Sequence, residues 1–394
     1  MTDKQPIPVV VRDLHLERDR EVQRLSASVD DTEIWFQMPA QIPLAARGEA
    51  FLAPALFEAM VRNAPVQIES GISLSPKWLQ RLSTIQSIFR SWNPDLHLVD
   101  IVAEPGEPEK GLEDALCCFS GGVDSSYTLA CHGHEISHLL LIQGFDTWQS
   151  AEDWEENKKA RARFARDTGK TILAVDSNVR EFFEARRIYW GLVIGSVLAG
   201  LGATFAPRLF FIPSSWTYQD LHAYGTHPLV DPLWSTEVTR VVHHGADTGR
   251  SEKIERIAEH EELLNQLQVC WKSCSRNCGV CPKCVRTSLA LHLIGKESRN
   301  LPRYSSSRQL NVLKPDGEGT LPFVEDLILA CKRHGARDIQ RKLLGMRKRF
   351  LLWDAAKSFG KALTGGWGQH VYRSLKPREW HTMRATLRSP RSLF

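Results

Sequence analysis

The chain contains 394 residues, of which 42% are hydrophobic, 24% charged and 9% aromatic. These fractions are ordinary for a globular protein and exclude an intrinsically disordered chain or a collagen-like fibre. The net charge of +4 is unevenly spread, because residues 301–394 hold 19 basic and 7 acidic side chains, whereas residues 1–300 hold 31 and 39. This uneven charge, an acidic body followed by a basic tail, is a first indication of what the tail could bind.

Residues 1–110 are predicted to form a separate, small α+β domain. Alternating runs predict strands at 6–14, 33–39 and 96–104, and longer apolar patterns predict helices at 49–61 and 75–92. The second helix opens with a Ser-Pro start. A link rich in proline and glycine, residues 103–111, ends the domain, and we recognise no catalytic motif within it.

Residues 111–300 change to alternating strands and helices. Strands are expected at 114–120, 138–145, 170–176 and 208–215, and helices at 124–133, 152–169 and 188–207. This alternation predicts an α/β fold with a parallel sheet and helices on both faces. Ligands of such sheets bind beyond the carboxyl ends of the strands. A third part, residues 301–394, is expected to be basic and largely helical.

The segment 188–207 is uncharged and approaches the length of a membrane span. Its four glycines and its Ser and Thr residues favour a helix buried against the sheet instead. The N-terminal residues contain no apolar signal core, so a cytoplasmic protein without a transmembrane span is expected.

A glycine-rich loop, Ser120-Gly121-Gly122-Val123-Asp124-Ser125, lies between the first predicted strand of this part and its helix. The glycines allow a sharp turn and a close approach of backbone to a ligand. The N–H groups of the following helix can bind an anion, the two serine hydroxyls can donate to phosphate oxygens, and Asp124 can hold Mg²⁺. An ordinary strand-to-helix turn is the alternative.

This loop resembles the signature of the N-type ATP pyrophosphatases, the PP-loop superfamily. The resemblance implies an adenine nucleotide alpha-hydrolase-like (HUP) fold and cleavage of ATP between the α- and β-phosphates, with adenylation of a substrate oxygen. It implies that Ser120, Asp124 and Ser125 are catalytic and that the whole loop binds ATP. Gly144 and Phe145, at the end of the second strand, are expected to meet the adenine mostly through backbone atoms.

Five cysteines lie between residues 270 and 284. Two overlapping C-x-x-C steps with one cysteine upstream can surround a tetrahedral ion with four thiolates, and a closed all-sulfur site is typical of structural zinc. The spacing suits a metal site in a reducing compartment better than a set of disulfides, and the alternative is a loop of free thiols.

The cysteine block resembles the zinc loop of the 7-cyano-7-deazaguanine synthases, a PP-loop branch, over residues 112–295. Cys270, Cys278, Cys281 and Cys284 follow the order of that pattern. Two departures are an arginine, Arg286, two positions after the last cysteine where three are expected, and an extra cysteine, Cys274, which is an alternative fourth ligand to Cys270. The resemblance implies an AMP-forming carbon–nitrogen ligase that uses ATP, Mg²⁺ and a structural Zn²⁺.

A loop rich in aromatic and polar residues follows the fourth strand of this part and suits a planar ligand. Trp216 or Tyr218 could stack on a base, while Asp220 or Asp231 could accept hydrogen bonds from ring N–H groups. A surface loop with half-buried tryptophans is the equal alternative. The adjacent histidines at 243 and 244 are not expected to share a metal, because neighbours on a strand point to opposite faces.

Arg250 and Lys253 are candidates for neutralising the departing pyrophosphate. The alternative is that both are surface charges of a helix.

The basic tail mixes apolar and cationic residues over 340–363, which indicates a helix. It could pack on the acidic body of the chain, contact tRNA, lie on a membrane surface or dock on a partner, and the first is favoured. A small-molecule substrate is expected, and the sequence allows a homo-oligomer.

Three functions are compared. The first is adenylation of a carboxylate or amide for amide or nitrile formation, as the resemblance implies. The second is tRNA thiolation, which would use the tail for RNA and a cysteine such as Cys274 to carry sulfur. The third is a nucleotide-binding regulatory module without turnover.

Overall fold

The computed structural model describes residues 6–145, 150–317 and 319–363. The chain divides into two compact units, Met1–Asp247 (unit 1) and Thr248–Phe394 (unit 2). This division differs from the boundaries near residues 110 and 300 that the sequence suggested.

Unit 1 contains a sheet of ten strands in the order β12-β11-β8-β9-β10-β3-β2-β1-β4-β6. Its strands are β1 (Val9–Arg18), β2 (Val22–Val29), β3 (Thr32–Pro39), β4 (Val66–Ile68), β6 (Ile101–Val102), β8 (Ala115–Cys118), β9 (Ile136–Ile142), β10 (Thr171–Ser177), β11 (Leu209–Pro213) and β12 (Arg240–His244). A separate pair joins β5 (Ser73–Leu74) and β7 (Glu104–Pro105) in parallel.

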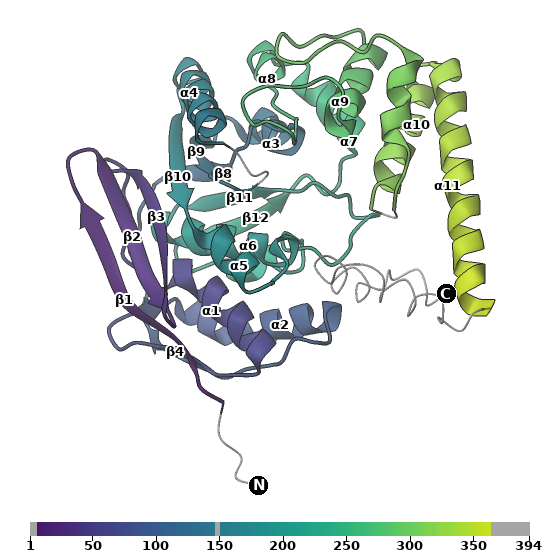
Figure 1. Cartoon of the computed structure of the whole chain (residues 1–394). Helices are drawn as coiled ribbons and strands as arrows, with labels where there is room; N and C mark the ends of the chain where they lie inside the picture. Colours follow the sequence, from purple (N-terminus) through teal and green to yellow (C-terminus); the bar gives the residue numbers. More distant parts are fainter. Residues whose placement is uncertain (1–5, 146–149, 318, 364–394) are drawn as a thin grey trace. The chain divides into compact units, whose positions relative to one another are not determined.

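The five strands from β12 to β10 are parallel to one another, so their carboxyl ends meet at one edge. Two helices, α3 (Val123–His132) and α4 (Ala151–Asp167), cover one face, and α5 (Val179–Ala185) and α6 (Trp190–Phe205) cover the other (Figure 1). The α/β fold with a parallel sheet between helices is therefore confirmed in its coarse form, and it is compatible with a Rossmann-like arrangement.

The N-terminal strands extend this sheet. β3 pairs antiparallel with β10 through Gln37–Asp176 and Phe36–Ser177, and β3, β2 and β1 form an antiparallel meander. The hydroxyl of Ser177 also donates to the carbonyl of Trp35, and the side chain of Asn178 accepts from the N–H of Trp35 and donates to the carbonyl of Glu33. The strands of residues 1–110 and of the parallel sheet thus belong to one sheet because the ladder continues from β10 to β3.

The helices α1 (Glu49–Arg62) and α2 (Pro76–Trp92) and the 3₁₀ helix η1 (Asp231–Trp234) complete unit 1. α2 begins where the Ser-Pro start predicts, since the hydroxyl of Ser75 accepts from the N–H of Trp78. The indole N–H of Trp78 in turn donates to the carbonyl of Trp234, at 2.7 Å. This hydrogen bond between Trp78 and Trp234 joins η1 to α2.

The apolar segment 188–207 forms α6, which is buried along almost its whole length against α1 and β11. Its glycines allow this packing. A Cβ added at Gly200 would lie 2.5 Å from the carbonyl oxygen of Glu49 at the start of α1, and one at Gly202 would lie 2.4 Å from the ring of Phe210. Among the residues that the structure describes, no helix is long and apolar enough to cross a membrane.

Unit 2 is helical in the residues that the structure describes. Its elements are α7 (Arg250–Ile257), α8 (Glu261–Asn265), α9 (Pro282–Leu293), η2 (Ser307–Leu313), α10 (Leu321–Arg333) and α11 (Arg337–Leu363). α10 contacts α7, α9 and α11 (Figure 1). The helix expected over 340–363 is thus confirmed as the main part of α11.

Candidate functional site

The glycine-rich loop connects the carboxyl end of β8 to the start of α3, as the sequence predicts. Gly121 has a φ of +79°, a conformation that disfavours any residue with a Cβ. Gly122 is the N-cap of α3, and its N–H points to the hydroxyl of Ser120 at 3.4 Å. The hydroxyl of Ser125 donates to the carbonyl of Gly122 at 3.2 Å, and Val123 is wholly buried, which anchors the first turn. The loop therefore presents a helix N-terminus at the edge of the sheet where parallel strands end.

Asp124, in the first turn of α3, meets a residue that sequence reasoning did not single out. The hydroxyl of Ser215 donates to Oδ2 of Asp124 at 3.3 Å. Ser215 follows β11, the neighbour of β8 in the sheet, so the loop after β11 reaches the glycine-rich loop. Its position two residues beyond a strand of the parallel sheet was the available signal, because both strands end at the same edge.

Gly144 and Phe145 follow β9, next to β8, as expected. Gly144 has a φ of +75°, and its carbonyl accepts from the guanidinium of Arg180. The carbonyl of Phe145 accepts from the indole N–H of Trp190 at 3.2 Å, and the two rings lie 4.8 Å apart. Both carbonyls thus have partners within unit 1, so a contact to adenine through backbone stays a prediction.

The aromatic loop after β11 contains three of the predicted substrate residues. Trp216 is half-buried with its ring 4.3 Å from that of His222, and Tyr218 is 59% exposed. Oδ2 of Asp220 accepts from the hydroxyl of Thr217 at 2.7 Å. The structure thus brings an aromatic pair, Trp216 with His222, close to the residue that contacts Asp124.

Asp231 occupies a different position from the other three. It is wholly buried in η1, where Oδ1 accepts from the backbone N–H of His227 at 3.1 Å and Oδ2 lies 2.7 Å from Nδ1 of His243. Burial raises the pKa of Asp231, although the bonds to His243 and His227 oppose the rise. Asp231 therefore holds the loop in place, and this geometry does not offer it to the ring N–H groups of a ligand.

His243 and its neighbour point to opposite faces of β12, as expected. The ring of His243 reaches η1, whereas Nδ1 of His244 lies 3.0 Å from the hydroxyl of Thr128 on α3. The two imidazoles therefore cannot share one ion.

The lowered pKa of His227 predicts that the folded protein loses stability as the pH falls below about 6.5. Burial, together with the nearby imidazoles of His243 and His222, lowers this pKa to about 4. The unfolded chain takes up this proton near its ordinary pKa of about 6.5. Stability from neutral His227 is hence complete above about pH 6.5 and falls as the pH drops toward 4, by about 2 kcal/mol at about pH 5.

We expect His227→Gln to flatten the dependence of the urea midpoint on pH in this range. The control His134→Gln, at a side chain that is 78% exposed, should leave the dependence as in the parent; an equal slope for all three proteins would contradict the assignment.

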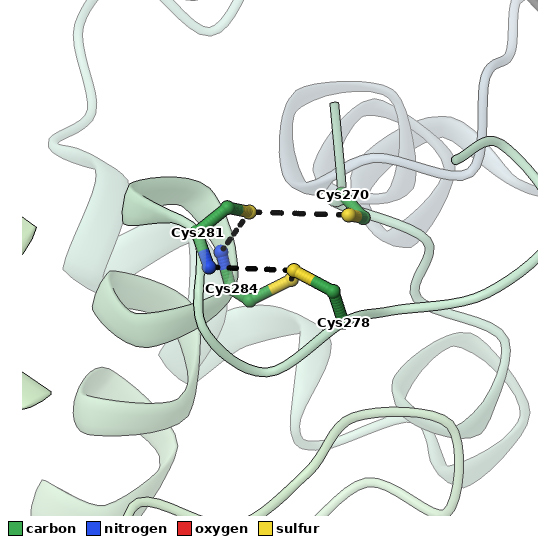
Figure 2. A group of neighbouring side chains, drawn as sticks. All are labelled: Cys270, Cys278, Cys281 and Cys284. Atoms are coloured by element: carbon green, nitrogen blue, oxygen red, sulfur yellow. Dashed lines mark hydrogen bonds between the residues drawn. The ribbon is translucent and has the colours of Figure 1, made fainter. Parts of the chain in front are cut away.

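The cysteine block of unit 2 forms a compact group of four thiols. Figure 2 shows Cys270, Cys278, Cys281 and Cys284 with their sulfur atoms turned toward one another, all within 4.8 Å. The sulfur atoms of Cys270 and Cys281 lie 3.9 Å apart, and those of Cys278 and Cys284 lie 4.0 Å apart. A tetrahedral zinc ion with metal–sulfur bonds of about 2.3 Å requires sulfur pairs about 3.8 Å apart. The group could therefore bind a metal such as zinc.

Backbone N–H groups point at these sulfur atoms. The N–H of Cys281 donates to the sulfur of Cys278 at 3.3 Å, and the N–H of Cys284 donates to that of Cys281 at 3.4 Å (Figure 2). Partial burial by itself would raise the pKa of Cys278, but hydrogen bonds from the N–H groups of Val280 and Cys281 and from the thiols of Cys270 and Cys281 together lower this pKa to about 7. Burial raises the pKa of Cys281 and Cys284, so a cation at the centre would be needed to ionise all four thiols.

Asn277 organises the loop and was missed by sequence reasoning. Its Oδ1 accepts from the N–H groups of Val269 and Cys270, at 2.9 and 3.1 Å, and its Nδ2 donates to the carbonyls of Leu267 and Asn300. One side chain thus ties the upstream cysteine to the chain that follows the block.

The geometry of the four thiols favours Cys270 over Cys274 as the fourth member of the group. Cys270 belongs to the group of four, and Cys274 does not, although it is buried. Arg286, the arginine that follows the last cysteine by two positions, lies on α9, and its guanidinium is 3.9 Å from the centre of the Phe323 ring on α10.

Arg250 and Lys253 lie in the first turn of α7. Lys253 is only 2% exposed, so its interpretation as a surface charge is wrong. Ser251, between them, donates from its N–H and its hydroxyl to Asp326, and the charge of Arg250 acts on the same carboxylate. Both cations belong to unit 2 and the glycine-rich loop belongs to unit 1, so their expected action on pyrophosphate stays a prediction.

We compared the chain with protein-family models, curated proteins and solved structures, and none of them matches it.

Proposed function

We propose that the protein is an ATP-dependent adenylating enzyme, a carbon–nitrogen ligase similar to the 7-cyano-7-deazaguanine synthases. The observation that carries this proposal is the position of residues 120–125. A loop of this composition lies between a strand of a parallel sheet and the N-terminus of a helix, and Asp124 in that helix faces Ser215 of the neighbouring loop. Ligands of parallel sheets bind at this edge, and a helix N-terminus attracts phosphate.

The chemistry assigned to the loop is transfer of AMP. A carboxylate or amide oxygen of the substrate attacks the α-phosphate of ATP, and pyrophosphate leaves. A nitrogen nucleophile then displaces AMP and gives an amide or nitrile. The N–H groups of the loop are preorganised donors for the negative charge that develops on the phosphate oxygens, so no nucleophile from the protein is required.

Three side chains have roles in this scheme. Ser120 and Ser125 donate hydroxyls to phosphate oxygens, and for Ser125 this means exchanging its bond to the carbonyl of Gly122. Asp124 would hold Mg²⁺, for which a carboxylate on the first turn of a helix, steadied by Ser215, is a suitable oxygen ligand. The magnesium ion would neutralise charge on the phosphates.

The four thiols would hold Zn²⁺ as a structural ion. All four positions of a tetrahedron are taken by sulfur, which leaves no position for a water or a substrate. The zinc would thus keep the loop of residues 270–284 folded and would not enter the reaction.

The tRNA-thiolating alternative has less support from the described residues. A sulfur carrier must be an accessible thiol with a lowered pKa. Cys274, the candidate for this role, is only 6% exposed.

The test is a product assay with labelled ATP and the small-molecule fraction of a cell extract. We expect AMP and pyrophosphate to form only when the fraction is present. Asp124→Asn keeps the shape of the side chain and removes its charge, so the rate should fall by about a hundredfold or more. The control is Asp114→Asn, the same substitution at an exposed position before the other end of β8, and it should retain activity.

Other products would contradict the proposal. Release of ADP and phosphate would mean that the loop has been misinterpreted. Bound ATP without AMP would favour the nucleotide-binding regulatory module, or a macromolecular substrate if AMP forms after tRNA is added.

A further inference from the structure

α11 carries a cationic surface that the proposed function does not use. The helix has 27 residues, which corresponds to about 40 Å. The helix packs on α10, and its residues Leu343, Met346 and Phe350 are buried. Outside this contact lie six exposed cations, which we call the basic surface of α11: Arg337, Arg341, Lys342, Lys348, Arg349 and Lys357.

These cations are poorly neutralised by the described residues of unit 2. Within the residues that the structure describes, only Arg341 of the six forms an ion pair, with Asp338 at 3.2 Å. Both side chains of that pair are almost fully exposed, at 78% and 90%, so the pair contributes little. The sequence that follows, residues 364–394, adds six basic residues and one acidic residue. Docking of the tail on the acidic body of the chain stays a prediction, and within the described residues of unit 2 the basic surface of α11 is not neutralised.

An aromatic side chain lies among these charges. Trp353 is 53% exposed, and Nζ of Lys357 lies 4.7 Å from the centre of its ring. An exposed ring beside a cation can stack on a nucleobase while the ammonium group contacts the adjoining phosphate.

A membrane surface fits the same helix less well. Leu351, Leu352 and Trp353 are all exposed and consecutive, so each is about 100° from the next around the axis, and Leu351 and Trp353 lie on nearly opposite sides of the helix. A helix that lies in a bilayer surface needs its apolar side chains gathered on one side and its cations on the other. On α11 the exposed apolar residues and the cations are intermingled, which suits a polyanion with planar bases.

We propose that the basic surface of α11 binds single-stranded RNA, with phosphates on its cations and a base stacked on Trp353. This binding is independent of ATP chemistry. It would bring the enzyme to a nucleic acid whether or not that RNA is the substrate.

The experiment measures binding of the full chain to a fluorescein-labelled single-stranded RNA of about 20 nucleotides by fluorescence anisotropy. The double variant K348E/R349E should lose at least about tenfold in affinity and lower the slope of log K against log salt by about 1.4, since each cation contributes about 0.7 on a single strand. The control R20E/K110E changes the net charge equally at exposed positions of unit 1 and should lose less than about threefold.

Trp353→Ala tests the stacking, with Leu352→Ala as the control because the two side chains are adjacent and similarly exposed. We expect about a tenfold loss for the first and less than about a twofold loss for the second. Equal losses in the two charge-reversal variants, or in Trp353→Ala and Leu352→Ala, would overturn the proposal. Sedimentation with phosphatidylserine vesicles without any RNA binding would overturn it in favour of a membrane surface. The helix content of each variant, measured by far-ultraviolet circular dichroism, should equal that of the parent, so that a loss of affinity is not due to unfolding of α11.

Discussion

Replacing Cys281 by serine is expected to weaken zinc binding about a hundredfold, whereas replacing Cys274 by serine is expected to leave the affinity unchanged. The sulfur of Cys281 lies 3.9 Å from that of Cys270 and accepts from the N–H of Cys284, so it occupies one corner of the tetrahedron. Structural zinc sites contribute about 10–16 kcal/mol of apparent binding free energy, so one thiolate corresponds to about 3 kcal/mol, or about a hundredfold in affinity. Cys274 is buried in the same loop but lies outside the group of four.

The measurement is the zinc content of the purified proteins by mass spectrometry, together with the absorption of cobalt-substituted samples. The parent and Cys274→Ser should each hold one zinc per chain and show sulfur-to-cobalt charge transfer. Loss of zinc in Cys274→Ser, or an affinity of Cys281→Ser equal to that of the parent in competition with a zinc chelator, would show that the four ligands are misassigned. Iron and sulfide in the parent would favour the tRNA-thiolating function over the adenylating one.

The local features of this site could be predicted because each depends on a short stretch of chain. The loop before α3, the Ser75 cap of α2 and the helix α6 all follow from glycine, capping and hydropathy signals within a few residues. The spacing of the cysteines likewise indicated a metal loop. It left open whether Cys270 or Cys274 completes the group, because the answer depends on Asn277, which fixes the backbone of Cys270.

Contacts between residues that are far apart in the sequence could not be predicted from local sequence patterns. The ladder between Gln37 and Asp176 joins strands separated by well over a hundred residues, and nothing near either residue specifies its partner. The bond from Ser215 to Asp124 has the same origin, since β8 and β11 are neighbours in space and not in sequence. Asp231 looked like a ligand-binding carboxylate because its loop is polar, but burial under that loop can be seen only in three dimensions.

The packing of α6 gives the second large prediction. Gly200→Ala is expected to destabilise the protein even though alanine favours a helix by about 1 kcal/mol over glycine. The added Cβ would lie 2.5 Å from the carbonyl oxygen of Glu49, a backbone atom that cannot rotate away. Glu49 is itself wholly buried and paired with Arg47 at 2.8 Å, so α1 is held at this point. Overpacking a core costs about 1–3 kcal/mol, and a contact this short belongs at the upper end of that range. After the gain of about 1 kcal/mol in helix propensity we expect a net loss of about 2 kcal/mol in the free energy of unfolding.

Gly345 in α11 is the matched control, because its Cβ would meet only the end of the Arg349 side chain, at 3.8 Å. There alanine should stabilise the helix by up to about 1 kcal/mol, so the two substitutions should move the urea midpoint in opposite directions. Urea titrations followed by far-ultraviolet circular dichroism measure both. A Gly200→Ala protein as stable as the parent would mean that α1 and α6 are separated more widely than in this structure. The glycines of α6 would then be unrelated to its contact with α1.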